Sequence, residues 1–302
     1  MWKKSLLILA FIGLINTYSK ACDACGCGIG SVYWGILPNN NLHYLGLWWQ
    51  HQRFKTHLDH DDALHPESLE YFNTLELRGR FYLSDRFSIT ALVPVGFHRR
   101  QQLGEWVDLR GLGDVSLLGN FRLFDSSDSL SRRIRHRFEL GAGVKLPTGT
   151  FRHLDAENEV NPNFQLGSGT WDLLFSANYT ALLGKLGMQT NLTYKWNTTN
   201  ADDYRFGHRL NGTLMLFYRQ GNPSLEWMPN LGLYGEWGGQ DVQYGYWQTN
   251  TGGHLMMANA GVEFYAGRCN WGVSYLHPLA QHWSAGQVNA RSRASAHFSV
   301  YF

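Results

Sequence analysis

The chain has 302 residues, of which 44% are hydrophobic, 15% aromatic and only 17% charged, and 33 are glycines. Apolar and aromatic residues are too plentiful for a disordered chain. After the N-terminus no run of about 18 apolar residues indicates a membrane-spanning helix. The composition therefore favours an all-β protein, and the length fits one mid-sized barrel.

Residues 1–21 have the pattern of a secretory signal peptide. Lys3 and Lys4 precede an apolar run, and Ser19 and Ala21 supply the small residues of a cleavage site before Cys22. Removing this segment leaves 23 basic residues against 24 acidic ones, so the mature chain has no basic excess that would indicate a nucleic-acid partner. We expect a signal peptide at 1–21, a Cys-rich periplasmic segment at 22–42 and a barrel at 43–302.

Apolar and polar residues alternate with a period of two through most of the remaining chain, which predicts β-strands. In one example, Leu75 and Leu77 lie on one face, and Glu76 and Arg78 lie on the other. About twelve strands are expected, near residues 43–54, 69–83, 87–97, 115–123, 138–146, 171–179, 186–196, 205–219, 225–237, 254–266, 269–277 and 293–302.

The expected connections alternate between short and long. Short or medium ones fall at 84–86, 125–133, 183–184, 220–224 and 267–268, and long polar ones at 55–68, 99–110, 147–169, 197–204, 238–252 and 278–291. This asymmetry is typical of outer-membrane barrels, which have short periplasmic turns and long outer loops. A soluble β-sandwich has no reason to order its loops in this way.

Charged residues are concentrated on one face of the expected strands, and the opposite face is apolar. A water-soluble barrel places its apolar face inside, whereas a membrane barrel places it outside. We therefore predict a transmembrane antiparallel up-and-down β-barrel of about 12 strands, surrounded by outer-membrane lipid, with both termini in the periplasm. Tryptophans would form girdles at the two lipid–water boundaries: Trp48, Trp49, Trp171, Trp196, Trp227, Trp237 and Trp271.

The polar face provides candidate pore-lining residues: Glu76, Arg78, Arg80, Arg122, Arg137, Glu139 and Lys145. They could line an open lumen or form ion pairs that plug it. The last strand alternates up to a terminal Phe302. This ending looks like the signature by which the barrel-assembly machinery recognises outer-membrane proteins, so that machinery is an expected partner.

Three short motifs resemble one known family. Val93-Pro94, Gly111-Leu-Gly-Asp114 and Val144-Lys-Leu-Pro-Thr-Gly149 resemble segments of the phenol-degradation meta-pathway family of outer-membrane proteins, and the Cys-rich start resembles a Bacteroidetes-like branch of that group. The resemblance implies a barrel and the passage of small, often hydrophobic, molecules, and it supplies no catalytic residues.

Four cysteines are candidates for disulfides or a metal site. Cys22, Cys25 and Cys27 lie in the N-terminal segment, and Cys269 lies at a short turn that we expect on the same side of the membrane. In an oxidising periplasm disulfides are favoured, but four thiolates could also bind a soft metal ion. Cleavage directly before Cys22 leaves lipidation of this residue as a third alternative.

Two histidine-containing segments suggest other chemistry. His57, His60 and His65 in the first long loop could bind a metal ion together with nearby aspartates, although a solvated, charged loop is the favoured interpretation. His282 and Ser284 in the last long loop resemble the base and nucleophile of outer-membrane phospholipases, an enzyme reading that we rank below passage.

The expected function is non-enzymatic passage of a small solute, hydrophobic or metal-linked, across the bacterial outer membrane. A lipid hydrolase using His282 and Ser284, and a metal-binding or structural barrel, are the alternatives. We expect no cofactor.

Overall fold

A computed structural model describes residues 41–56, 68–102, 104–126, 133–154, 161–222 and 224–302. The expected signal peptide and most of the Cys-rich segment lie outside the described residues, and both stay predictions. Within the described residues, no helix is long and apolar enough to cross a membrane.

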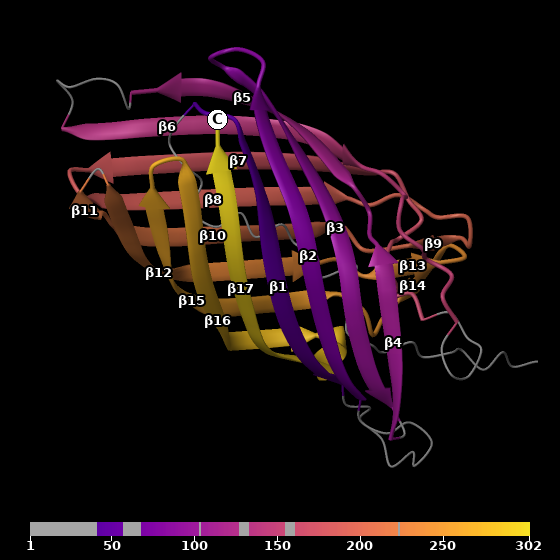
Figure 1. Ribbon diagram of the computed structural model, residues 1–302. Helices are drawn as coiled ribbons and strands as arrows, with labels where there is room; N and C mark the ends of the chain where they lie inside the picture. Colours follow the sequence, from indigo (N-terminus) through magenta and orange to yellow (C-terminus); the bar gives the residue numbers. More distant parts are fainter. Residues whose placement is uncertain (1–40, 57–67, 103, 127–132, 155–160, 223) are drawn as a thin grey trace, which may run out of the picture.

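The chain forms strands almost throughout (Figure 1). The strands of the first half are β1 (Tyr44–Thr56), β2 (Ser68–Tyr82), β3 (Phe87–Gln102), β4 (Glu105–Leu112), β5 (Ser116–Asp125), β6 (Ile134–Lys145), β7 (Asp172–Leu183) and β8 (Leu186–Trp196). The second half has β9 (Tyr204–Arg205), β10 (Arg209–Tyr218), β11 (Gln220–Asn222), β12 (Leu225–Gly238), β13 (Asp241–Gln243), β14 (Tyr246–Gln248), β15 (Gly253–Ala266), β16 (Cys269–Trp283) and β17 (Val288–Tyr301), with the short 3-10 turn η1 (Ser284–Gly286) before β17.

The main sheet closes on itself with antiparallel neighbours. Its strands follow the order β1, β2, β3, β5, β6, β7, β8, β10, β12, β15, β16 and β17, and β17 pairs with β1 to close the ring. Strand β3 pairs with β4 and then with β5, so β4 and β5 occupy one position in the wall, and β10 and β11 occupy another in the same way. The result is the predicted twelve-position antiparallel barrel, which confirms the expected fold class.

The two faces of the wall have opposite chemistry, as predicted. Leu45, Leu47 and Trp49 on β1 are exposed on the outer face, whereas Arg78 and Arg80 on β2 are buried inside. Because a buried charge needs partners and hydrocarbon offers none, this orientation suits a wall that faces lipid outside and a polar lumen inside.

Trp48 does not belong to the expected outer girdle. It points inward, because neighbouring residues of a strand face opposite sides and Trp49 occupies the outer side. The girdle tryptophans at 49, 171, 196, 227 and 237 are exposed.

Several strands continue beyond their expected ends. β3 and β4 form a hairpin over most of the expected loop 99–110, and β16 runs to Trp283 rather than ending near residue 277. The apolar alternation stops where the outer face meets water, because polar side chains are tolerated there. Backbone pairing between the strands continues beyond that point. Hydrophobic patterning therefore underestimated the length of the strands at the end of the barrel that carries the long connections.

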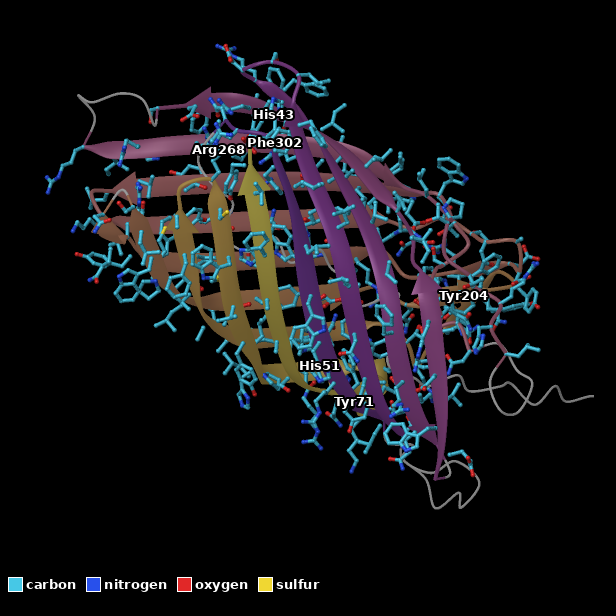
Figure 2. All side chains as sticks on the ribbon, viewed as in Figure 1. His43, His51, Tyr71, Tyr204, Arg268 and Phe302 are labelled. Atoms are coloured by element: carbon cyan, nitrogen blue, oxygen red, sulfur yellow. The ribbon has the colours of Figure 1, made fainter. Side chains whose placement is uncertain are left out.

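The end of the barrel with long connections, which we call the long-loop end, carries a small second sheet of β14, β13 and β9. These strands lie in the expected loops 197–204 and 238–252 or beside them. Tyr204 lies at this end, whereas His43, Arg268 and Phe302 lie together at the opposite, short-turn end (Figure 2).

The outer face generates a stability prediction. Leu77 is exposed near the middle of β2, so Leu77→Arg should place a charge in hydrocarbon and lower the free energy of unfolding in lipid vesicles by about 2–4 kcal/mol. The matched control is Leu154→Arg in the exposed long-loop region, which should cost far less. Denaturant titration in vesicles measures both, and equal effects would contradict a lipid-facing wall at Leu77.

Candidate functional site

The lumen contains a layer of paired charges toward the short-turn end. Arg80 Nη2 lies 2.6 Å from Glu139 Oε2, and Arg137 Nη2 lies 2.6 Å from Asp125 Oδ2. Arg122 joins the two pairs, at 3.7 Å from Glu139 and 3.5 Å from Asp125. Apart from the half-buried Asp125, these side chains are buried. They come from β2, β5 and β6, with β3 between β2 and β5 in the wall.

Asn41 ties the chain before β1 to this layer. Its Oδ1 accepts hydrogen bonds from Arg122 at 2.5 Å and Arg137 at 2.9 Å. A carboxamide oxygen that accepts from two guanidinium groups offsets part of their desolvation. Three arginines thus share two carboxylates and one amide, an arrangement that fixes geometry more than it adds stability.

A second charge cluster lies toward the long-loop end. Lys145 Nζ lies 2.6 Å from Asp114 Oδ2 and 2.9 Å from Asp172 Oδ2, and it also contacts the Ser168 hydroxyl. Thr170 donates to the other oxygen of Asp172 at 2.8 Å. All seven predicted pore-lining residues therefore lie on the inner face, and Glu76 pairs with Arg78 there. Their role in conduction stays a prediction.

Asp114 holds a segment of the expected loop 147–169 against the wall. Its carboxylate accepts from the backbone N–H of Gly149 at 3.0 Å and of Ser168 at 2.9 Å. The backbones at Gly149 and Gly167 touch, since a Cβ at Gly149 would lie 2.9 Å from the Gly167 Cα. The two motifs that carry the family resemblance, 111–114 and 144–149, thus meet in space and anchor one loop.

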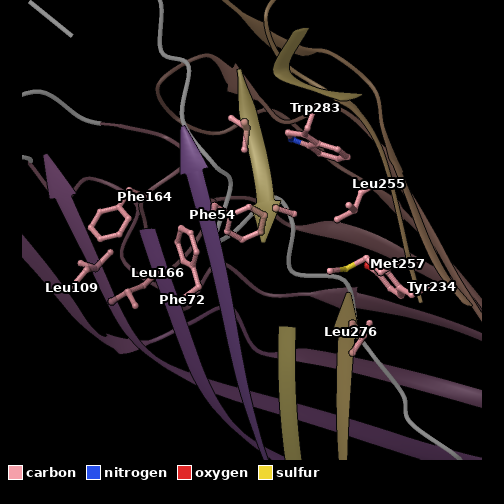
Figure 3. Close-up of a cluster of buried hydrophobic side chains, with 12 residues drawn as sticks. Phe54, Phe72, Leu109, Phe164, Leu166, Tyr234, Leu255, Met257, Leu276 and Trp283 are labelled. Atoms are coloured by element: carbon pink, nitrogen blue, oxygen red, sulfur yellow. The ribbon is translucent and has the colours of Figure 1, made fainter. Parts of the chain in front are cut away.

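The anchored segment, residues 161–170, folds into the barrel. Phe164 and Leu166 are buried in an apolar cluster with Phe54, Phe72 and Leu109, shown in Figure 3. Figure 3 also shows the remaining labelled members, contributed by β12, β15 and β16: Tyr234, Leu255, Met257, Leu276 and Trp283. We call this set the luminal apolar cluster. Sequence reasoning missed it, because the inward aromatic residues interrupt an otherwise polar face and Phe164 lies in an expected outer loop.

A cavity of about 140 Å³ lies between the apolar cluster and the charges. Its wall includes Phe72, His98, Lys145 and Leu166. Leu166 packs where β3 changes partner from β4 to β5, beside Pro94, and a Cβ at Gly96 would lie only 2.6 Å from it. Leu166 therefore fills the notch in the wall at this change of partner.

A stacked column inside the barrel was not expected from the sequence. The Arg78 guanidinium lies 4.6 Å from the Trp48 ring centroid, and the His297 ring stacks on Trp48 at 4.7 Å. His297 Nε2 lies 3.0 Å from Glu263 Oε2. The inward Trp48 thus links charged groups of β2 and β15 across β1, β17 and β16.

The metal and disulfide hypotheses fall largely outside the described residues. Cys22, Cys25 and Cys27, and His57, His60 and His65, are not among them, and Cys269 lies at the start of β16 on the short-turn end. Across the described ranges no group of three His, Cys, Asp or Glu residues could hold a metal ion. A site shared by the four cysteines stays a prediction.

His282 and Ser284 do not form a base–nucleophile pair. His282 belongs to β16 and faces the His254 ring at 6.1 Å, whereas the buried Ser284 begins η1 and its N–H donates to the Gly252 carbonyl at 2.7 Å. Among the described side chains, no hydrogen bond joins the two. Both residues were expected in a loop, but β16 extends to Trp283, and His282 is exposed on this strand whereas Ser284 is buried.

Outside the membrane-spanning strands, the connections are tied to one another. Arg152 forms a bidentate ion pair with Asp202, and its hydrogen bonds hold the pKa of that carboxyl below the usual value. Tyr204 donates to Asp241 at 2.5 Å. These contacts join described parts of the connections 147–169, 197–204 and 238–252 to one another.

The role of Asp114 is testable. Asp114→Ala removes the acceptor for the Gly149 and Ser168 amides, while Lys145 keeps Asp172 as a partner. Because hydrogen bonds to a charged group contribute about 1.5–3 kcal/mol each, exchange of these two amides should accelerate roughly tenfold or more. Hydrogen–deuterium exchange measures this, with the Leu118 amide in β5 as the internal reference. Unchanged exchange at Gly149 and Ser168 would show that Asp114 is not the anchor.

Several solved structures have a fold similar to that of this barrel. An outer membrane channel from Pseudomonas putida F1 is 17% identical, with a TM-score of 0.66 over 91% of this chain and 100% of that chain. The beta domain of the Bordetella autotransporter BrkA is 12% identical, with a TM-score of 0.50 over 87% of this chain and 100% of that chain. At these identities the likeness concerns the fold alone.

Sequence comparison settles the family. No curated protein matches the chain. One family model, described as "Putative MetA-pathway of phenol degradation", matches residues 70–267 and so covers most of the barrel, including the motifs that meet at Asp114. The chain belongs to this family.

Proposed function

We propose that the protein lets a small solute cross the outer membrane without chemical conversion. The observation that carries the proposal is a closed wall, apolar outside and charged inside, around a lumen that holds a cavity. The Pseudomonas putida protein of the same fold is described as an outer membrane channel, which supports this function.

The order of chemistry along the lumen favours a solute with both an apolar body and a polar group. From the long-loop end, such a solute meets aromatic side chains of the luminal apolar cluster, then Lys145, then the paired charges around Glu139. The near balance of paired acids and bases disfavours strong selection for ions of one sign. A metal-linked solute would depend on the histidines and cysteines outside the described residues.

We also infer that the chain is not an enzyme. The different environments of His282 and Ser284 support this, because His282 is exposed and Ser284 is buried, whereas a nucleophile needs its base within hydrogen-bond reach. Release of fatty acid from vesicles that contain the purified protein would contradict it.

Passage is tested by swelling of protein-containing liposomes. We expect phenylalanine to enter faster than glutamine of similar length, and sucrose to enter most slowly of the three because the lumen is narrow. Phe164→Ala combined with Leu166→Ala opens the luminal apolar cluster and should raise the sucrose rate about two- to fivefold. The matched control, Leu83→Ala combined with Phe87→Ala on the outer face, should leave it unchanged. Should no solute enter faster than into protein-free liposomes, the proposal fails.

We propose that both termini and the short turns face the periplasm. The short connections and Phe302 share one end of the barrel, as in outer-membrane proteins inserted from the periplasm, and recognition of the Phe302 strand by the assembly machinery stays a prediction. In intact cells a membrane-impermeant maleimide should label Tyr246→Cys at the long-loop end, but neither Lys185→Cys at a short turn nor the unmodified chain. Labelling of Lys185→Cys alone would reverse the orientation.

A further inference from the structure

The outer face of the barrel carries a cluster of cations near the long-loop end. Closer to the middle of β1 this face is apolar, with Leu47 and Trp49 exposed. Farther along, the outer rows of β17, β1, β3 and β4 carry five basic side chains, which we call the outer basic patch: Arg53, Lys55, Arg99, Arg110 and Arg291. On the same rows of the described strands, Asp108 is the one acidic residue.

Strand register brings these residues together. Arg53 lies opposite Tyr71, Tyr71 opposite Arg99, and Arg99 opposite Asp108, so one row crosses four strands. Arg291 lies in a bulge of β17 that faces Arg53. Figure 2 shows His51 and Tyr71 at this end of β1 and β2, far from Phe302.

Aromatic rings and Asp108 hold three of the five cations, Arg53, Arg99 and Arg110, in place before any ligand arrives. The Arg53 guanidinium lies 5.6 Å from the Tyr71 ring centroid, and the Arg99 guanidinium lies 4.9 Å from that of Trp106. Arg99 Nε donates to Asp108 at 2.7 Å, and Arg110 lies 3.4 Å from the same carboxylate. Fixed arginines lose less entropy on binding an anion.

The rest of the outer face at this end is different. Trp171, Trp196 and Trp237 are exposed there, as in an ordinary aromatic girdle. Among the described residues, the cations of the outer basic patch therefore lie in one sector of the barrel. They are not part of an even ring of basic residues at the lipid–water boundary.

The cations fall into two groups with aromatic rings between them. Arg53, Lys55 and Arg291 belong to β1 and β17, and Arg99 and Arg110 belong to β3 and β4, two to three strand spacings or roughly 10–15 Å away. Tyr71 and Trp106, with ring centroids 6.0 Å apart, lie between the groups.

We propose that the outer basic patch binds a glycolipid of the outer leaflet that carries a phosphate at each end of a disaccharide. Each cation group takes one phosphate by charge-assisted hydrogen bonds, the aromatic rings lie under the sugars, and the acyl chains follow the apolar face below. The assignment to the outer leaflet rests on the proposed orientation, but it does not depend on passage through the lumen.

The test measures lipid binding to the purified full-length protein in detergent by native mass spectrometry. We expect diphosphoryl lipid A to bind, and lipid A with both phosphates removed to bind far more weakly. Arg53→Gln combined with Arg110→Gln, which leaves the Arg99–Asp108 pair intact, should weaken binding of diphosphoryl lipid A roughly 30-fold, at about fivefold for each cation. The matched double variant Lys185→Gln with Arg268→Gln, at exposed short-turn positions, should bind as the unmodified protein does.

Equal weakening in the two double variants, or equal binding of the dephosphorylated lipid, would overturn the proposal. If phosphatidylglycerol binds as tightly as diphosphoryl lipid A, the two-phosphate assignment is overturned. If inorganic phosphate displaces the lipid when both are at the same concentration, the site binds free phosphate and the proposal is overturned. No binding of diphosphoryl lipid A to the unmodified protein would overturn the proposal as well. Liposome swelling should be the same in both double variants, so failure here is distinct from failure of the proposed passage.

Discussion

Hydrocarbon provides no hydrogen-bond partners, so a wall that crosses it must pair every backbone N–H and C=O within itself. Pairing of β1 with both β2 and β17 is the contact that meets this constraint here, because it joins the first and last strands and closes the main sheet into a ring. Once the ring is closed, alternation along each strand assigns every residue to lipid or to lumen. The inward Trp48 and outward Trp49 show how strictly this assignment holds.

Closure also forces charges from distant parts of the sequence into a narrow interior. Burying a guanidinium or carboxylate costs free energy unless the group is paired. In this lumen the charged groups are paired in ion-pair networks rather than in single pairs. Arg80, Arg122 and Arg137 share Glu139, Asp125 and Asn41, and Lys145 joins Asp114 to Asp172. The same side chains that make the interior polar also narrow it, so any path for a solute runs between paired charges.

The segment 161–170 changes the character of the lumen at its other end. Asp114 anchors the segment through Gly149 and Ser168, and Phe164 and Leu166 then bring apolar surface into a polar barrel. Along the lumen, the side chains change from apolar ones near the long-loop end to charged ones nearer the short-turn end. On the outer face, a separate change leads from the apolar surface to the outer basic patch. The long-loop end thus offers two different surfaces, one for a solute and one for lipid.

Period-two alternation along the chain predicted the fold class and the number of wall positions, because it has only one meaning in a closed membrane wall. It also predicted the inward placement of seven charged residues: Glu76, Arg78, Arg80, Arg122, Arg137, Glu139 and Lys145. The sequence pattern misplaced the ends of β3 and β16 and missed β4, which lies mostly in the expected loop 99–110, since apolar patterning ends at the lipid boundary whereas strand pairing continues into water. Only the tertiary structure decided which charges pair, that Phe164 and Leu166 enter the lumen, and that Arg53, Arg99 and Arg110 share one outer surface. Those facts depend on strand register and on loop anchoring across long sequence separations, which local pattern does not encode.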